Sequence, residues 1–175
     1  MTMEIRFLNA EDAPAYWDIR LEALRCEPEA FGSSAEEHRA LPVAEIAARI
    51  SGDPLNTFVV GAFVGGKLVG TAGFFRNKGL KERHKGRVWG VYVTREARGK
   101  GAGREMMRML LERAAQVEGI EQIMLSVVTT QDAAVRLYGS LGFESFGCER
   151  CALKIGDRYL DEENMVLFVK RPVSK

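Results

Sequence analysis

The feature that most constrains this fold is a glycine-rich turn placed between a predicted strand and a predicted helix. The turn spans residues 98–104 (RGKGAGR) and holds three glycines within five positions. Before it, residues 88–93 (VWGVYV) are rich in β-branched and aromatic side chains, which favours a strand. After it, residues 100–118 carry their apolar side chains on one helical stripe. Because residues 120–128 predict a second strand, the unit predicts a parallel β–α–β crossover.

The rest of the chain predicts antiparallel strands and further helices. The predicted strands are residues 4–8, 57–64, 67–76, 143–153 and 159–169, and the predicted helices are residues 12–26 (with Asp12 as N-cap), 42–50 and 132–141. Tight glycine turns join two strand pairs as hairpins. Together these elements predict an α/β fold: a mixed, mostly antiparallel sheet with one parallel pair and helices on both faces. A chain of 175 residues is the size of one domain, so we expect a single domain over residues 1–175.

Charge and hydropathy exclude several classes of protein. Lys and Arg number 25 against 24 Asp and Glu, and this balance argues against a nucleic-acid-binding surface. No apolar run approaches the ~20 residues that span a bilayer, so we expect no membrane association. The first residues mix charged and apolar side chains and do not resemble a signal peptide. We therefore expect a cytoplasmic protein.

The cysteines predict neither a disulfide framework nor a metal site. There are three, Cys26, Cys148 and Cys151, and an odd number fits a reducing compartment. Cys148 and Cys151 form a lone CxxC on a predicted strand, where that spacing places the side chains on opposite faces. A zinc site would need further ligands, and the chain has only two histidines, His38 and His84. We expect no bound metal.

The glycine-rich turn predicts an anion-binding site. Glycines allow the backbone to approach a ligand closely, and the following helix offers free N–H groups and the positive end of its dipole. This arrangement suits a pyrophosphate, and Arg98, Lys100 and Arg104 add positive charge. The spacing fits neither a P-loop nor a dinucleotide fingerprint, because Thr94 and Arg104 stand where those motifs require glycine. The alternative is a flexible turn with solvated basic side chains.

Two segments resemble sequence motifs of one enzyme family. Residues 98–103 (RGKGAG) resemble motif A of the GCN5-related N-acetyltransferases, and residues 134–143 (AVRLYGSLGF) resemble their motif B. The predicted order of strands and helices is also similar to that family over nearly the whole chain. The resemblance implies the family's fold, in which two parallel strands splay apart, and its cosubstrate, acetyl-coenzyme A.

The resemblance also implies which residues bind the coenzyme. The main chain of Val91, Tyr92 and Val93 would pair with the pantetheine arm. Gln131 stands where family members often have Asn and could reach the same arm, or it could simply begin a helix. The turn that would hold the pyrophosphate through backbone N–H groups consists of Arg98, Gly99, Lys100, Gly101, Ala102, Gly103 and Arg104.

Catalytic roles follow from the same resemblance. The backbone N–H near Val91 would polarise the thioester carbonyl, and Tyr138 would act as general acid toward the departing thiolate. Tyr138 also falls on the apolar stripe of its helix, so it could be a core tyrosine instead. The strand before motif A lacks the acid that many members carry there. The general base is therefore sought at Glu36 or Glu37, with His84 as a further candidate.

The predicted function is direct transfer of an acetyl group from acetyl-coenzyme A to a primary amine, without an acyl-enzyme. We expect the acceptor to be a small molecule. The alternatives are acetylation of a protein N-terminus or lysine, and a non-catalytic module that senses acetyl-coenzyme A. Because family members often dimerise through terminal strands, the resemblance also allows a homodimer.

Overall fold

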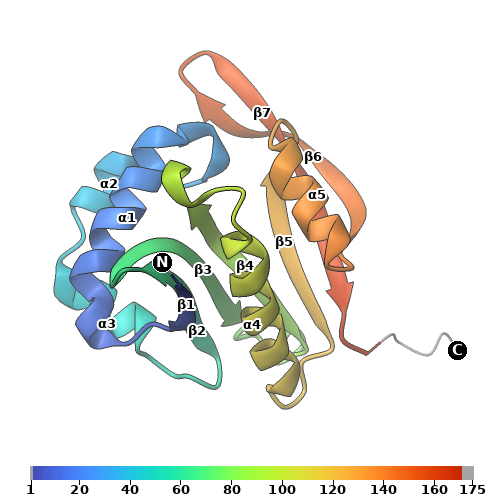
Figure 1. Cartoon of the computed structure of the whole chain (residues 1–175). Helices are drawn as coiled ribbons and strands as arrows, with labels where there is room; N and C mark the ends of the chain where they lie inside the picture. Colours follow the sequence, from blue (N-terminus) through green and yellow to red (C-terminus); the bar gives the residue numbers. More distant parts are fainter. Residues whose placement is uncertain (1, 171–175) are drawn as a thin grey trace, which may run out of the picture.

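The computed structural model describes residues 2–170, which form one seven-stranded sheet flanked by helices (Figure 1). The strand order is β1-β2-β3-β4-β5-β7-β6, and only the β4–β5 pair is parallel. The predicted α/β fold with a mixed, mostly antiparallel sheet is confirmed. The strands are β1 (Met3–Phe7), β2 (Thr57–Val64), β3 (Lys67–Arg76), β4 (Lys85–Val93), β5 (Gln122–Val128), β6 (Glu144–Ile155) and β7 (Arg158–Phe168).

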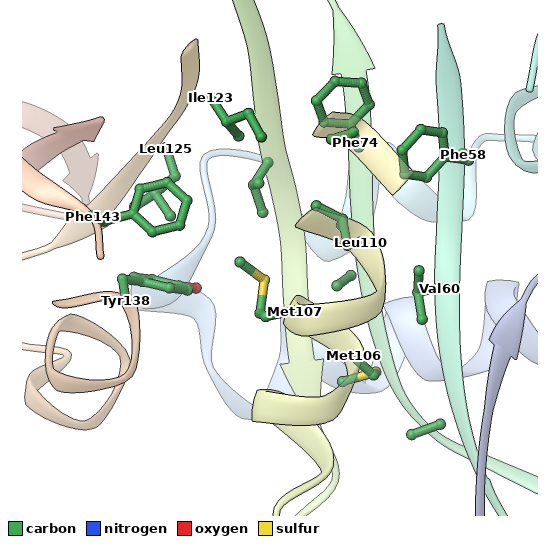
Figure 2. Close-up of a cluster of buried hydrophobic side chains, with 14 of the residues drawn as sticks. Phe58, Val60, Phe74, Met106, Met107, Leu110, Ile123, Leu125, Tyr138 and Phe143 are labelled. Carbon is green, nitrogen blue, oxygen red and sulfur yellow. The ribbon is translucent and has the colours of Figure 1, made fainter. Parts of the chain in front are cut away.

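The helices divide between the two faces of the sheet. The main helices are α1 (Ala13–Cys26), α2 (Ala35–Arg39), α3 (Val43–Ile50), α4 (Ala102–Gln116) and α5 (Asp132–Ser140), with short 3-10 turns at η1 (Ala10–Asp12), η2 (Pro28–Ala30) and η3 (Arg95–Ala97). On one face, Met106, Met107 and Leu110 of α4 are fully buried against Phe58 and Phe74 of the sheet (Figure 2). On the other face, α1 and α3 cover a second buried cluster. None of the helices within residues 2–170 is long and apolar enough to cross a membrane.

Strands β4 and β5 pair over only three residues. Lys85–Arg87 of β4 align with Gln122–Met124 of β5, and the ladder ends there. Beyond it, β4 continues to pair with β3 as far as Val93, while β5 continues to pair with β7 as far as Val128. The carboxyl-terminal halves of the two parallel strands therefore diverge, as Figure 1 shows.

A β-bulge in β4 lies where the strands diverge. Thr71 of β3 aligns with Tyr92 and Gly73 aligns with Trp89, so that two residues of β4 face the single residue between them. One of the two is Gly90, whose φ of +62° is unfavourable for residues with a side chain. The Thr71 hydroxyl donates a hydrogen bond of 3.2 Å to the Gly90 carbonyl and holds the bulge in place. Because a bulge bends its strand and increases the local twist, it turns β4 away from β5.

Two local elements differ from the sequence predictions. Residues 35–39 form the short helix α2, which the sequence analysis did not predict, and it begins with a capping box between Ser34 and Glu37. In β6 the pairing with β7 is irregular between Glu149 and Leu153, and Cys151 has a φ of +54°. The strand is therefore not regular at the CxxC, so the simple alternation of its side chains does not apply. The three cysteines are free and exposed.

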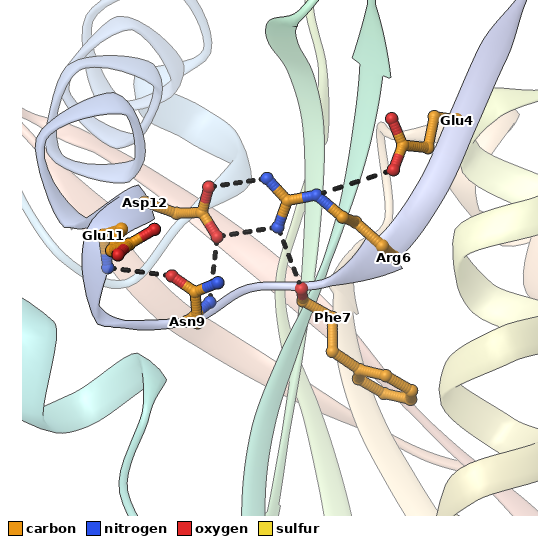
Figure 3. Close-up of polar contacts among 6 residues, drawn as sticks. All are labelled: Glu4, Arg6, Phe7, Asn9, Glu11 and Asp12. Atoms are coloured by element: carbon orange, nitrogen blue, oxygen red, sulfur yellow. Dashed lines mark hydrogen bonds and ion pairs between the residues drawn. The ribbon is translucent and has the colours of Figure 1, made fainter.

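Asp12 joins the first strand to the first helix, although not as the sequence predicted. It occupies the N-cap position of α1, but its side chain makes no capping bond there. Instead its carboxylate accepts hydrogen bonds of 2.7 and 2.8 Å from Arg6 of β1 and one of 2.9 Å from the Asn9 amide (Figure 3). The Arg6 hydrogen bond holds the pKa of Asp12 below its ordinary value. This two-bonded pair fixes α1 against the edge of the sheet.

Replacing Asp12→Asn should lower the free energy of unfolding by about 1 kcal/mol, because a two-bonded ion pair is lost while solvent already screens the partly exposed Arg6. For a chain of this size that is a fall in Tm of about 2–4 °C. The pKa of Asp12 is depressed in the folded state, so the stabilisation is complete above the ordinary value of 3.8 and is lost as the pH falls through the lower value. Thermal melts at pH 7 and pH 2 measure both effects.

The matched control is Glu4→Gln, which removes a carboxylate that is 68% exposed and lies 3.8 Å from the same arginine. It should change Tm little. A control as destabilised as Asp12→Asn, or an Asp12→Asn deficit that persists undiminished at pH 2, would contradict this account of the Arg6–Asp12 pair.

Candidate active site

The glycine-rich turn has the open backbone that anion binding requires. Gly99 and Gly101 have φ values of +74° and +86°, which few residues with a side chain adopt. A Cβ built on either glycine would meet no heavy atom within 4 Å, so both Cα atoms face open space. Here glycine is needed for the backbone conformation, and the space above it is free for a ligand.

Helix α4 begins directly at this turn. Gly101 is its N-cap residue, and the Glu105 amide makes an early helical bond of 3.0 Å to the Gly101 carbonyl. Helix geometry leaves the preceding amides, those of Ala102, Gly103 and Arg104, directed out of the helix end. A Cβ on Gly103 would lie 3.4 Å from Leu137 of α5, so the start of α4 packs closely against α5. The turn therefore presents several N–H donors at the positive end of the helix dipole.

The basic side chains of the turn have individual roles. Arg98 donates a hydrogen bond of 2.9 Å to the Val93 carbonyl and forms an ion pair of 2.9 Å with Glu27, which ties the turn to the end of β4 and to the end of α1. Arg104 donates to the Ser140 hydroxyl at 2.9 Å and links α4 to α5. Lys100 is exposed. Unlike Arg98 and Arg104, Lys100 takes no part in these hydrogen bonds and ion pairs.

The end of β4 offers free main chain toward β5. Val91 and Val93 pack against the cluster under α4, while Tyr92 is buried in the cluster under α1. The Tyr92 hydroxyl donates a hydrogen bond of 2.9 Å to Glu22 of α1, and burial followed by this bond raises its pKa. The side chains thus anchor the strand on both faces. The backbone edge of Val91–Val93 that faces β5 takes no part in the β4–β5 ladder.

Tyr138 lies on the same side of the sheet as α4. It is only 7% exposed, and its ring packs edge-on against Phe143 at a centroid distance of 6.0 Å. In Figure 2 its hydroxyl points toward the side where Met107 lies. Burial raises the pKa of Tyr138 above the ordinary value of 10.0. The hydroxyl therefore stays protonated at neutral pH and is a hydrogen-bond donor.

Gln131 lies just after the end of β5, the strand that diverges from β4. It is the N-cap residue of α5 and follows the end of β5 closely. Its amide donates to the Val128 carbonyl at 2.9 Å, and its carbonyl accepts from the Ala134 amide at 2.9 Å. The backbone of Gln131 therefore starts the helix.

The acidic candidates differ in their surroundings. Glu37 accepts a hydrogen bond of 2.8 Å from the Ser34 amide, and the bonds to Ser34 lower its pKa. Glu36 is exposed and lies in the first turn of α2. His84 immediately precedes β4, and its carbonyl accepts from the Glu121 amide at 2.8 Å. Val91 is seven residues further along, about 23 Å at strand spacing, so His84 lies at the far end of β4 from the divergence.

A large cavity opens on the face of the sheet covered by α1 and α3. Its volume is about 1100 Å³, and Tyr16 and Arg20 of α1, Glu37 of α2 and Trp89 of β4 are among its lining residues. A terminal nitrogen of Arg20 lies 3.6 Å from the position that a Cβ on Gly90 would take. The cavity therefore reaches the β4 bulge from the side opposite α4.

Sequence reasoning missed three polar residues near this region. His38 lines the cavity, is 5% exposed and lies with its Nε2 2.9 Å from the Trp17 carbonyl, while burial lowers its pKa. Glu162 of β7 aligns with Val128 at the end of β5, and burial followed by the nearby Glu149 raises its pKa. Arg20 is the third. All three owe their surroundings to tertiary packing, and no local motif marks them.

Among residues 2–170, His, Cys, Asp and Glu side chains form no group of three or more suited to a metal ion.

Comparison with known proteins identifies the family. Residues 16–143 match the model of the acetyltransferase (GNAT) family, which is more than half of the chain. The turn at residues 98–104, Tyr138 and the diverging strands all lie within the matched region. The chain belongs to the acetyltransferase (GNAT) family.

Curated relatives are similar over about half of the chain. A spermine/spermidine N(1)-acetyltransferase of Bacillus subtilis (strain 168) is 33% identical over 91 residues, which is 50% of this chain and 60% of that protein. The N-alpha-acetyltransferase RimI of Mycobacterium tuberculosis is 40% identical over 91 residues, covering 52% of this chain and 54% of that protein. The chain thus matches less than two thirds of these relatives' own length.

A solved structure confirms the fold over nearly the whole chain. The acetyltransferase of GNAT family from Streptococcus pneumoniae superposes with a TM-score of 0.85 at 20% identity, and the match covers 95% of this chain and 99% of that one. At this level of identity the likeness concerns the fold alone.

The substitution Gly101→Val should weaken coenzyme A binding about 100-fold or more. A β-branched residue cannot hold a φ of +86° without strain, so the amides at the start of α4 lose their alignment. Each charge-assisted hydrogen bond lost costs about 1.5–3 kcal/mol. Isothermal titration calorimetry with coenzyme A measures the effect.

The matched control is Gly66→Val in the β2–β3 turn, where φ is +79° and a Cβ would likewise meet nothing within 4 Å. It imposes the same backbone strain far from the turn at residues 98–104. It should lower Tm and leave coenzyme affinity unchanged. Normal affinity in Gly101→Val would refute a phosphate site at this turn.

Proposed function

We propose that this protein transfers the acetyl group of acetyl-coenzyme A, the acyl donor of its family, to the primary amine of a small molecule. The observation that carries the proposal is the 1100 Å³ cavity that reaches the β4 bulge from the face opposite α4. A small acceptor in this cavity and a coenzyme held from the α4 side would meet at Gly90 and Val91. Ligand sites of about this size are usual for small molecules.

The residues of the chain fit the coenzyme in three places. The amides of the turn and of the start of α4 would hold its pyrophosphate. The free backbone edge of Val91–Val93 would pair with the amides of its pantetheine arm, as an added strand does. The Gln131 side chain would reach the same arm from the start of α5. When bound, the coenzyme supplies an acetyl thioester, whose carbonyl carbon is the electrophile.

The chemistry assigned to the protein is positioning, charge stabilisation and proton transfer. With the thioester bound, a neutral amine would form the C–N bond as the C–S bond breaks. The Val91 amide would donate to the carbonyl oxygen as negative charge develops there, and one such donor contributes about 3 kcal/mol. The buried Tyr138 hydroxyl would donate to the departing sulfur. Because the pKa of Tyr138 is raised, this donation is better described as a hydrogen bond than as complete proton transfer.

The proton released by the amine goes to a carboxylate, directly or through water. Glu36 and Glu37 remain the proposed bases, and Glu37 lines the cavity. Its bonds to Ser34 lower its pKa, which makes it a weaker base than an ordinary glutamate. The raised pKa of Glu162 adds a third carboxylate at the end of β5. Single Gln variants of the three distinguish them by the acidic limb of the pH–rate profile.

Two other functions remain alternatives, and one of them has support from a relative. The similarity to an N-alpha-acetyltransferase supports acetylation of a protein N-terminus. A module that only senses acetyl-coenzyme A would keep the turn but would not need Tyr138. The homodimer that the family resemblance allows would use β6, an edge strand whose Phe146 is 54% exposed.

The proposed function is tested by thiol release from acetyl-coenzyme A across a panel of amines. The panel contains free amino acids, polyamines and peptides with free N-termini. We expect turnover with one or more small amines. Turnover with peptides alone would instead establish the protein N-terminal function, and coenzyme binding without turnover on the whole panel would contradict transferase activity.

The variant Tyr138→Phe should lower kcat about 100-fold, as expected for loss of a group that assists the leaving thiolate. The coenzyme dissociation constant should change little, because the ring and its packing on Phe143 remain. Stopped-flow or steady-state thiol release measures kcat, and calorimetry measures binding.

Tyr159→Phe is the matched control, since that tyrosine is 56% exposed on β7, and it should retain full activity. An unchanged kcat in Tyr138→Phe would show that Tyr138 is a core residue without a catalytic role.

A further inference from the structure

Arg20 lies in the cavity with part of its charge unsatisfied. It projects from the middle of α1, and one terminal nitrogen, Nη1, is buried without a hydrogen-bond partner among the described residues. Its guanidinium stacks on the Phe31 ring at 4.5 Å, which holds its orientation. Burial lowers its pKa, although an arginine remains charged at any pH at which the protein is folded.

A buried cation without a partner destabilises a folded protein. Desolvation of a charge is costly unless an opposite charge or hydrogen bonds replace the lost water. The cation–π contact with Phe31 offsets part of that cost. It involves the face of the guanidinium and leaves the N–H donors in the guanidinium plane free. Arg20 thus offers the fork of N–H groups that matches a carboxylate.

The remaining charges of the cavity also favour an anion. Besides Arg20, it is lined by Arg49, Arg76, Lys78 and Arg83, against the two carboxylates Glu37 and Asp53. Both carboxylates already accept backbone hydrogen bonds, Glu37 from the Ser34 amide at 2.8 Å and Asp53 from the Leu55 amide at 3.0 Å. The lining therefore carries more cations than carboxylates. Arg49 is paired with Glu45 at 2.6 Å and Arg83 lies next to His84 at the far end of β4, so Arg20 is the lining cation that lies beside the β4 bulge.

The position of Arg20 relates this charge to the reaction. Its Nη1 lies 3.6 Å from the place of a Cβ on Gly90, and Gly90 precedes Val91, the proposed oxyanion donor. A group of the acceptor that is bound by Arg20 would therefore lie close to the acceptor's reacting amine. The carboxylate and amine of a small amino acid have such a separation.

We propose that the acceptor is a small amino acid or similar zwitterion, whose carboxylate is bound by Arg20 while its amine receives the acetyl group. This inference rests on the proposed function and names the substrate class of the same site. A polyamine, which is a multiple cation at neutral pH, would meet the positive cavity without a carboxylate to pair with Arg20. The specificity therefore differs from that named for the spermine/spermidine relative.

The test compares acceptors that differ only in the carboxylate. Each amino acid of a panel is measured beside its carboxamide and its decarboxylated amine, with spermidine and alanyl peptides as further arms. We expect kcat/KM to be about 10- to 100-fold higher for the carboxylate form, because a charged hydrogen-bonded pair is lost in the others. Peptides that carry an acidic second residue show whether a side-chain carboxylate can replace the free one.

Arg20→Met should reduce this preference toward unity, mainly by raising KM for the carboxylate acceptor. Arg20→Lys, which keeps the charge and loses the fork, should give an intermediate preference. The matched control is Arg25→Met, which removes an exposed arginine from the same helix and should keep the wild-type preference. Because Arg20→Met relieves a buried unpaired charge, its Tm should be equal to or above that of the wild type.

The results separate this inference from the proposed function. A wild-type enzyme that acetylates carboxamides or spermidine as well as amino acids would overturn the inference while the transferase activity stands. An Arg20→Met variant with an unchanged preference would do the same. Coenzyme binding without turnover on any acceptor would instead refute the proposed function itself.

Discussion

The structure depends on a parallel strand pair that is kept short. β4 and β5 share a ladder of only three residues, and the bulge at Gly90 turns β4 away immediately afterwards. A sheet normally satisfies its backbone groups by continuing its ladders, so an interruption in the centre of a seven-stranded sheet leaves free main-chain donors and acceptors. An amide-containing ligand can form hydrogen bonds with these free donors and acceptors. Arg20, which lines the cavity on the α1 side, lies beside Gly90 of the bulge, so the interruption is close to both faces of the sheet.

The surrounding elements hold this interruption open. Tyr92 anchors β4 to α1 through Glu22, and Arg98 ties the glycine-rich turn to the Val93 carbonyl and to Glu27. Helix α4, in which Met106, Met107 and Leu110 are fully buried, fixes the turn over the opposite face. Tyr138 gains its raised pKa from the same packing, since the burial that makes it a core residue also keeps its hydroxyl protonated. A structural and a catalytic role are therefore compatible for this tyrosine.

Much of the fold could be predicted because its patterns are local. The bounds of β2 and β3 agree with the predicted ranges, since runs of β-branched and aromatic residues flank a Gly-Gly turn. Helix α2 was missed because five residues are too few for a helical period, although the Ser34–Glu37 capping box was a signal. The sequence predicted that Arg98 and Arg104 add positive charge at the turn, but their hydrogen bonds to Val93, Glu27 and Ser140 could not be predicted because these partners are distant in the sequence or set by packing. The setting of Arg20 could not be predicted, because the burial of one terminal nitrogen arises only when α1 packs over β4.

The central claim is that the pantetheine arm of coenzyme A forms hydrogen bonds with the free backbone of β4 where the β4–β5 ladder is interrupted. Amide hydrogen exchange with and without coenzyme A, resolved to single residues, tests it most directly. The account predicts slower exchange at the amides of residues 91–93 and 101–104 on coenzyme binding, with little change in the β2–β3 hairpin, which is fully paired already. Protection spread evenly over the sheet, or protection that spares residues 91–93, would contradict it.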